Sequence, residues 1–150
     1  LFYSTVTTLN RWFADSPIRQ QTTSGYNYPN GVDALAMTSF EFENGVTGRG
    51  NSSLGTSLGM AARLVGDLGI VEIQESFWNT TEAVIKTYEP NSDVAKVEQL
   101  SRPSKGAGYV HMIESVSNSV FAGELENQQH THAFNLEIMR SLDQTRSDLN

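Results

Sequence analysis

The sequence predicts an α+β fold: a single, largely antiparallel sheet of about six strands, with helices packed on one face and the other face open for subunit contact. Near both ends of the 150-residue chain, apolar residues recur at helical spacing. From about residue 18 to residue 100 they recur at every second position instead, as in strands. Strands grouped together between terminal helices are typical of one sheet with helices on one side. One core, and hence a single domain over residues 1–150, is expected for a chain of this length.

The first helix is predicted over residues 1–14. Phe2, Val6 and Phe13 fall on one helical face, and Asp-Ser-Pro at residues 15–17 then stops the pattern. No capping residue precedes this helix, and position 1 is not Met. We therefore expect the chain to be an excised piece of something longer.

The strands are predicted from the alternation of apolar and polar side chains. In residues 34–42, Ala34, Ala36, Phe40 and Phe42 face one side, and the intervening residues face the other. Asn44-Gly45 follows, a hairpin signal in which both turn residues accept positive φ, so residues 46–54 are the antiparallel partner. Four further strands are predicted at residues 58–64, 70–75, 82–89 and 94–100.

Two helices are predicted after the glycine-rich stretch of residues 101–108. The first carries an apolar stripe of Ile113, Val116 and Val120, and Gly123 stands where a C-terminal capping glycine belongs. The second carries Phe134, Ile138 and Leu142 on one side, with Thr131 as its N-cap.

Three glycine segments superficially resemble phosphate-binding loops. Gly48-Arg49-Gly50 lies inside a predicted strand, and Gly66-Asp67-Leu68-Gly69 lies between two strands, so neither leads into a helix N-terminus. We interpret the first as close packing and the second as a four-residue hairpin loop whose glycines take positive φ. Gly106 precedes a helix but lacks the Lys-Ser/Thr ending of a phosphate loop. No cofactor site is therefore predicted in this chain.

Composition excludes several classes of function. A net charge of -7 and a pI near 4.8 argue against nucleic-acid binding, and no apolar run is long enough to span a membrane. The chain has no cysteine, so an intracellular, cytoplasmic location is the default expectation.

Two residue pairs could suggest a chemical site. His130-Thr-His132 has no third ligand at a diagnostic spacing, and we interpret it as a helix start rather than a metal site. His111 and Glu114 lie one turn apart, and a surface pair is favoured over an acid-base pair.

Five segments, in order, resemble the C-terminal domain of the Gfo/Idh/MocA oxidoreductases, especially the dihydrodiol- and xylose-dehydrogenase-like branch. The resemblance covers most of the chain and is more specific for the domain than for a substrate. The segments are GVDALAMTSFEFENGVTGRGNSSL, RLVGDLGIVEI, FWNTTEAVI, GYVHMIESVSNSVFAGELEN and NLEIMRSLDQTR.

The resemblance implies that the chain works with a Rossmann domain that binds NAD or NADP and supplies a catalytic lysine in a Glu-Lys-Pro motif. Neither that domain nor that motif is in this sequence, so we expect no catalytic residue, no bound cofactor and no metal in this chain. The substrate would be a sugar-like small molecule, with Tyr3 at an aromatic position facing it. The open sheet face would join subunits into a homo-oligomer, with Arg49 reaching a carboxylate such as Glu41 across a two-fold axis. That face comprises Leu35, Met37, Ser39, Glu41, Thr47, Arg49, Asn51 and Ser53.

Two hypotheses follow from the sequence. The first is a substrate-binding and oligomerisation domain of an NAD(P)-dependent oxidoreductase that acts on a sugar, polyol or dihydrodiol. The second is a non-catalytic binding or assembly module built on the same sheet domain, which the absence of catalytic motifs favours. Either way, these 150 residues alone are expected to show no turnover.

Overall fold

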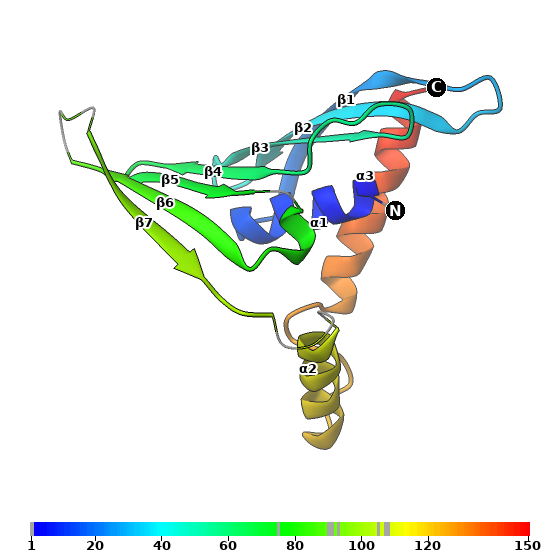
Figure 1. The fold of residues 1–150 in the computed structure, drawn as a ribbon. Helices are drawn as coiled ribbons and strands as arrows, with labels where there is room; N and C mark the ends of the chain where they lie inside the picture. The colour runs from blue at the N-terminus through cyan, green and yellow to red at the C-terminus, as the bar shows by residue number, and fades with distance from the viewer. Residues whose placement is uncertain (1, 75, 90–91, 93, 105, 107–108) are drawn as a thin grey trace. The chain divides into compact units, whose positions relative to one another are not determined.

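The computed structural model describes residues 2–74, 76–89, 92, 94–104, 106 and 109–150, with side chains at the N-terminal end described from residue 5 onward. Its contacts divide the chain into two compact units (Figure 1). Unit 1 comprises Leu1–Leu58 and Leu125–Asn150, and unit 2 comprises Gly59–Glu124. Each unit has its own antiparallel sheet, so the prediction of one sheet of about six strands is corrected to a three-stranded and a four-stranded sheet.

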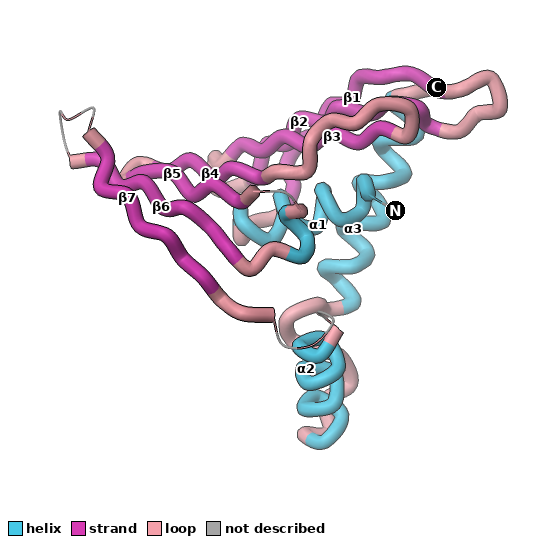
Figure 2. The backbone as a smooth tube through the Cα atoms, in the orientation of Figure 1, coloured by secondary structure: helices cyan, strands magenta, loops and turns pink. Residues whose placement is uncertain are grey.

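Unit 1 is a three-stranded sheet with two helices (Figure 2). The strands are β1 (Ile18–Asn27), β2 (Asp33–Phe42) and β3 (Thr47–Ser53), paired in the order β1-β2-β3, and the helices are α1 (Phe2–Ala14) and α3 (His132–Asp148). Helix α1 packs on β3, and α3 packs on β1. For this sheet, the expected placement of helices on one face is confirmed.

The alternation predicted for β2 is confirmed residue by residue. Ala34, Ala36, Phe40 and Phe42 are all buried, and Thr38 joins them on the same face. The Phe40 and Phe42 rings stack with centroids 6.2 Å apart, and Ala14 at the end of α1 completes the buried cluster. Ile18, Leu142 and Leu149 pack around its edge. Because side chains of a strand alternate, burial of this set places its neighbours on the opposite, open face.

Helix α1 approaches β3 closely because β3 has no side chain at two positions. A Cβ atom added at Gly48 would overlap the Asn10 side chain, and one added at Gly50 would overlap Val6. The Asn10 side chain also donates a hydrogen bond to the backbone oxygen of Arg49 at 3.3 Å. The interpretation of this glycine segment as a site of close packing is therefore correct.

The predicted end of α1 is also correct. Asp15 takes positive φ (47°) directly after the helix, and Pro17 cannot continue it. The backbone nitrogen of Asp15 donates a hydrogen bond to the backbone oxygen of Trp12 at 3.3 Å.

The hairpin at Asn44-Gly45 is present, but its turn differs from the prediction. Phe42 N donates to Val46 O at 3.0 Å, so three residues form the loop and only the third of them, Gly45, has positive φ (86°). Such a three-residue loop needs a left-handed residue only at its last position. Asn44 therefore keeps an ordinary backbone conformation.

Strand β1 was not assigned as a separate strand from the sequence. Its residues, IRQQTTSGYN, are polar on both faces, so burial does not produce an apolar alternation. Its inward face is satisfied by hydrogen bonds instead: the hydroxyl oxygens of Thr23 and Thr38 lie 2.9 Å apart, and Gln21 bonds to Ser141 of α3. A strand held in this way leaves little trace in a hydrophobicity pattern.

Unit 2 contains the four-stranded sheet and one α-helix. The strands β4 (Ala62–Gly66), β5 (Gly69–Ile73), β6 (Glu82–Tyr88) and β7 (Ala95–Ser101) pair in sequence order, a short 3-10 helix η1 (Phe77–Asn79) follows β5, and α2 spans Val110–Phe121. The strand predicted at residues 58–64 begins only at Ala62, because the stretch before it is irregular and Gly59 takes positive φ (73°). This irregular stretch is where the predicted continuous sheet is interrupted.

The segment Gly66-Asp67-Leu68-Gly69 is a tight turn between β4 and β5. Gly66 and Gly69 are cross-strand partners, so only Asp67 and Leu68 form the loop, shorter than predicted. Gly69 alone takes positive φ (155°), and a Cβ atom there would overlap the backbone oxygen of Lys86. Gly69 is therefore needed because β6 passes close to it, whereas Gly66 has open space around it.

Gly123 caps the C-terminal end of helix α2, as predicted. Gly123, at φ 71°, donates to Val120 O, and Glu124 donates to Ser119 O, which together form a Schellman motif. In the described part of the chain, no helix is both long and apolar enough to cross a membrane.

Candidate functional site

The open face of the three-stranded sheet gathers all eight residues predicted for subunit contact. They form cross-strand pairs between β2 and β3, and in this order along the sheet they are Leu35 with Ser53, Met37 with Asn51, Ser39 with Arg49, and Glu41 with Thr47. Met37, Ser39, Thr47, Arg49 and Asn51 are exposed, and the other three are half-buried. Their common location is thus established, and their role in subunit contact stays a prediction.

Strand β1 adds a third column to this face that was not predicted from the sequence. The added residues, paired with Leu35, Met37, Ser39 and Glu41 respectively, are Tyr26, Ser24, Thr22 and Gln20. The open face therefore consists of four rows of three residues. Tyr26 is a sequence signal for this column, because aromatic residues are enriched in strands.

The two ends of the open face differ in character. At one end, Tyr26 is 55% exposed and Met37 is 43% exposed, next to half-buried Leu35. At the other end, a register shift in β1 leaves Arg19 as an extra residue, and its guanidinium pairs with Glu41 at 2.5 Å. A bulge of this kind redirects a side chain. One end thus offers apolar area, and the other offers charge.

The ion pair bears on the expected contact of Arg49 with Glu41 of another subunit. Glu41 already has Arg19 of its own chain as a partner. Among the described residues, no carboxylate lies within ion-pair distance of Arg49. Arg49 therefore offers a positive charge on the open face. To pair with Arg49 of another subunit, Glu41 would have to give up its ion pair with Arg19 of its own chain.

Tyr3, the residue predicted to face a substrate, lies in the first turn of α1. Its side chain is outside the described part of the structure, so its proposed contact stays a prediction.

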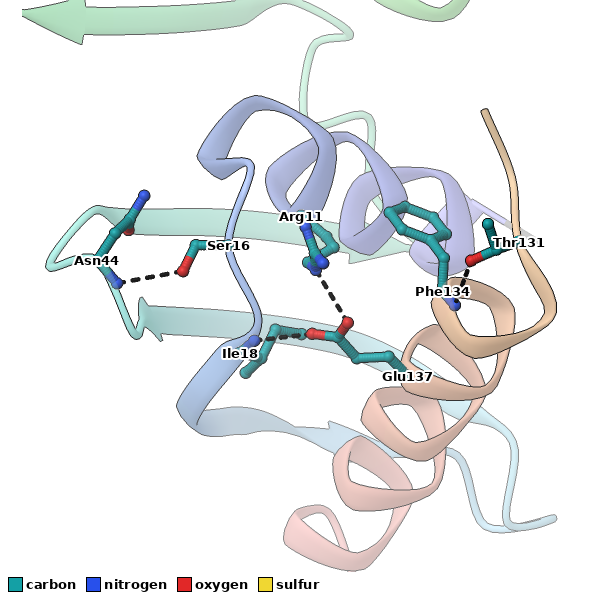
Figure 3. Close-up of polar contacts among 7 residues, drawn as sticks. All are labelled: Arg11, Ser16, Ile18, Asn44, Thr131, Phe134 and Glu137. Carbon is teal, nitrogen blue, oxygen red and sulfur yellow. Dashed lines mark hydrogen bonds and ion pairs between the residues drawn. The ribbon is translucent and has the colours of Figure 1, made fainter. Parts of the chain in front are cut away.

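A polar network joins α1, β1 and α3 on the helical side of unit 1 (Figure 3). Arg11 Nε donates to one carboxylate oxygen of Glu137 at 2.9 Å, and Ile18 N donates to the other at 2.7 Å. The Arg11 guanidinium also lies 5.3 Å from the centre of the Phe134 ring. Because both oxygens of Glu137 accept hydrogen bonds from the protein itself, this carboxylate is a structural anchor and not a free general base.

The start of α3 agrees with the prediction. Phe134 N donates to the Thr131 hydroxyl at 3.1 Å, so Thr131 is the N-cap. His132 Nδ1 lies 3.3 Å from a Glu126 oxygen, and the His130 ring packs edge-on against Phe134. Within the described residues, no group of three or more histidine, aspartate or glutamate side chains is placed to hold a metal ion.

A charge cluster lies on the surface of the sheet of unit 2. Glu72 on β5 pairs with Lys86 on β6 at 2.7 Å and more distantly with Arg63 on β4 at 3.9 Å. The hydrogen bond from Lys86, aided by the positive charges of Lys86 and Arg63, lowers the pKa of Glu72 below its usual range, against the opposing effect of burial. His111 and Glu114 lie one turn apart on exposed positions of α2, and the favoured interpretation of them as a surface or helix-capping pair stays a prediction.

The glycine segments do not fit a dinucleotide. The space beside Gly48 and Gly50 is filled by α1 side chains, and Gly66 to Gly69 is a turn between strands with no helix N-terminus after it. A pyrophosphate needs both room beside the glycines and the amide groups that open a helix. No step of a reaction can be assigned to a cofactor held by these residues.

Comparison with solved structures identifies the class of protein that shares this fold. UDP-N-acetylglucosamine 3-dehydrogenase GnnA from Acidithiobacillus ferrooxidans matches 95% of this chain with a TM-score of 0.77 at 12% identity. Aldose-aldose oxidoreductase from Caulobacter crescentus, solved with glycerol, matches 96% with a TM-score of 0.68 at 14% identity. An NAD-binding protein from Listeria innocua matches 97% with a TM-score of 0.64 at 15% identity. At these identities the likeness shows the fold alone, which is that of a part of oxidoreductases and NAD-binding proteins.

The chain spans less than half of each of these proteins: 44%, 43% and 47% of their respective lengths. No family model matches the sequence, and no curated protein matches it by sequence. The dihydrodiol- and xylose-dehydrogenase-like branch therefore stays a prediction from the sequence.

Proposed function

We propose that this chain is the substrate-binding and oligomerisation domain of an NAD(P)-dependent oxidoreductase of the Gfo/Idh/MocA type, acting on a sugar, polyol or dihydrodiol. The observation that carries the proposal is the match of 95–97% of the chain to a part of proteins named as oxidoreductases or NAD-binding proteins. Two of them are named for sugar substrates, which supports the substrate class. The order of the five resembling sequence segments supports the same family.

In this proposal, the cofactor lies on a separate domain. NAD or NADP, when bound there, accepts or donates the hydride. The described residues of this chain contribute a scaffold instead: α1 and α3 are fixed on the sheet by the Arg11–Glu137 pair and by the buried face of β2. A substrate held near the start of α1 would meet a rigid wall, which favours a productive orientation.

The open face of the three-stranded sheet is proposed as the contact between two copies. Tyr26, Leu35 and Met37 offer an apolar end, which becomes the centre of the contact when two copies meet there, and Arg19, Glu41 and Arg49 then lie toward its border. An apolar centre with a charged rim is the usual composition of a subunit interface. A two-fold axis through the apolar end would bring these three side chains against their own copies.

A non-catalytic assembly module is the second candidate. The Glu137 carboxylate favours it, because both of its oxygens are engaged by Arg11 and Ile18 and it is not free to act as a base. The two candidates make opposite predictions about cofactor binding by the gene product that carries this chain.

The test is a fluorescence titration of the complete gene product with NADH and with NADPH, using ATP as a control nucleotide. We expect saturable binding of one reduced cofactor, and cofactor-dependent oxidation of at least one member of a panel of sugars, polyols and dihydrodiols. The isolated 150 residues should show neither. A gene product that binds neither cofactor contradicts the oxidoreductase proposal and supports the assembly module.

A further inference from the structure

The two hairpin loops of unit 1 are near copies of each other in sequence. The loop between β1 and β2 reads Tyr28-Pro-Asn-Gly-Val32, and the loop between β2 and β3 reads Phe42-Glu-Asn-Gly-Val46. Both have an aromatic residue, a variable residue, and then Asn-Gly-Val.

Their backbone hydrogen bonds are also the same. In the first loop, Tyr28 N donates to Val32 O at 2.8 Å and Gly31 N donates to Tyr28 O at 2.9 Å. In the second, both corresponding bonds, Phe42 to Val46 and Gly45 to Phe42, are 3.0 Å long.

The asparagine and glycine of each loop match as well. The side-chain oxygen of each asparagine accepts from the valine nitrogen two residues later, at 3.2 Å for Asn30 and 3.1 Å for Asn44. Gly31 and Gly45 have φ values of 80° and 86°. The local geometry thus gives no reason for the two asparagines to differ.

What differs is the surroundings of the two asparagine side chains. The Nδ2 of Asn44 donates to Ala14 O at 2.8 Å, and its backbone nitrogen donates to Ser16 Oγ at 3.1 Å (Figure 3 shows the latter). Among the described residues, no group accepts a hydrogen bond from Nδ2 of Asn30. Both asparagines are exposed, but the segment at the end of α1 clamps Asn44 alone.

We propose that Asn30 is a site of spontaneous covalent modification and that the clamp on Asn44 protects the second site. The backbone nitrogen of Gly31 attacks Cγ of Asn30, a bond forms between them, and the Cγ–Nδ2 bond breaks. Ammonia leaves with the proton lost from the Gly31 nitrogen, and a cyclic imide remains. Water then opens the imide at either carbonyl to give aspartate or isoaspartate, with no oxidant or reductant involved.

Glycine is the residue at which this ring closes most readily, because it has no Cβ to obstruct the approach and little restriction on φ and ψ. A Cβ atom at either Gly31 or Gly45 would meet nothing within 4 Å, so both loops have room for the reaction. In Asn44, however, the bond from Nδ2 to Ala14 O holds the side chain and must open first. The need to open one such bond lowers the rate by roughly twofold to twelvefold.

The experiment follows both asparagines in one sample of the protein, kept folded at mildly alkaline pH. Digestion after arginine and glutamate places Asn30 in the fragment of residues 20–41 and Asn44 in that of residues 44–49. Mass spectrometry then measures the conversion of each amide to a carboxylate, and a parallel sample in denaturant measures the rates without structure.

We expect both asparagines to react more slowly in the folded protein than in denaturant, because the hydrogen bond of the attacking glycine nitrogen must open in either loop. The slowing should be severalfold greater for Asn44, which has the additional bonds to Ala14 and Ser16. Ser16→Ala should raise the Asn44 rate and leave the Asn30 rate unchanged. Asn30→Gln should abolish the product in fragment 20–41, because the longer side chain does not form the five-membered imide.

Equal folded-state rates for the two sites, after division by their denatured-state rates, would overturn the proposal. So would an Asn30 that reacts in denaturant but not in the folded protein. Because the folded and denatured samples are both unmutated, this comparison stands even if the Ser16→Ala variant does not fold.

Discussion

At the scale of single residues, the two glycines of β3 are required because they have no side chain. Gly50 leaves the space that Val6 of α1 occupies, and Gly48 leaves the space of Asn10. The Gly-x-Gly pattern that suggests a nucleotide loop is therefore explained by helix packing.

Gly50→Ala should destabilise unit 1 by about 1–3 kcal/mol, because the added methyl group overpacks the contact with Val6. Chemical denaturation followed by circular dichroism measures the change. The double variant Val6→Ala/Gly50→Ala should recover part of the loss, since the two side chains compete for the same space. Two losses that simply add would show that the contact is not the cause.

Gly66→Ala is the matched control for this substitution. Gly66 has open space around it and an ordinary φ, so alanine there should change stability by no more than about 1 kcal/mol. A large loss at Gly66 would contradict the interpretation of the β4–β5 turn.

The Glu72 carboxylate gives a prediction about pH. Because its pKa is lowered in the folded protein, its stabilising contribution is present above the pKa of the unfolded chain and is lost as pH falls through the folded value. Lys86→Met should raise the pKa of Glu72 more than Arg63→Met does, because Lys86 supplies the hydrogen bond and Arg63 lies at 3.9 Å. Carboxyl-detected NMR titration of the two variants compares them directly, and an equal shift would refute the assignment.

At the scale of elements, the helix ends were the most predictable features. Gly123, Thr131 and Pro17 act through the few backbone groups next to them, so their effect is visible in a short stretch of sequence. The alternation of buried and exposed side chains in β2 was equally predictable from the sequence, because one face of the strand is buried.

The features that sequence could not reveal depend on contacts between distant segments. In β1, the Gln21 amide donates to the backbone oxygen of Ser141 in α3, and the Thr23 hydroxyl bonds to Thr38 of β2. Nothing in the sequence IRQQTTSGYN indicates those partners. The break between β3 and β4 was missed for a related reason: the alternation of residues 58–64 continues through a stretch that does not pair as a strand until Ala62. The periodicity of a sequence indicates which way its side chains point, whereas strand pairing depends on contacts with segments that are distant in the sequence.

Thr131→Ala should destabilise α3 by about 1 kcal/mol, because Phe134 N loses its acceptor. Thr131→Ser keeps a hydroxyl at the same position and should lose much less. Amide hydrogen exchange in the first turn of α3 is the measurement. Protection factors that are the same in both variants would mean that the hydroxyl contributes nothing.

At the scale of the whole molecule, the open face of the three-stranded sheet predicts self-association. Met37→Glu places a charge in the apolar end of this face and should shift the protein toward monomer by at least tenfold in dissociation constant, measured by sedimentation. Met139→Glu is a matched control on α3, where methionine is 49% exposed, and should leave the association unchanged. Monomer alone in the unmutated protein at tens of micromolar, well above the roughly micromolar range of weak dimers, would contradict the interface.

The eight residues of the predicted interface were placed on one face by sequence alone, because alternation fixes faces once a hairpin is known. The third column from β1 and the Arg19–Glu41 pair required the register of the folded sheet. The expected contact of Arg49 with another subunit stays a prediction, since the structure describes a single chain.

Unit 1 is assembled from the first 58 residues and the last 26, with all of unit 2 between them in the chain. The contacts of Glu137 with Arg11 and Ile18 span 126 and 119 residues. During synthesis, the sheet therefore leaves the ribosome long before the helix that covers its β1 side. The part of its inward face that α3 covers is exposed until that helix has emerged, and it can meet chaperones or neighbouring nascent chains in the interval.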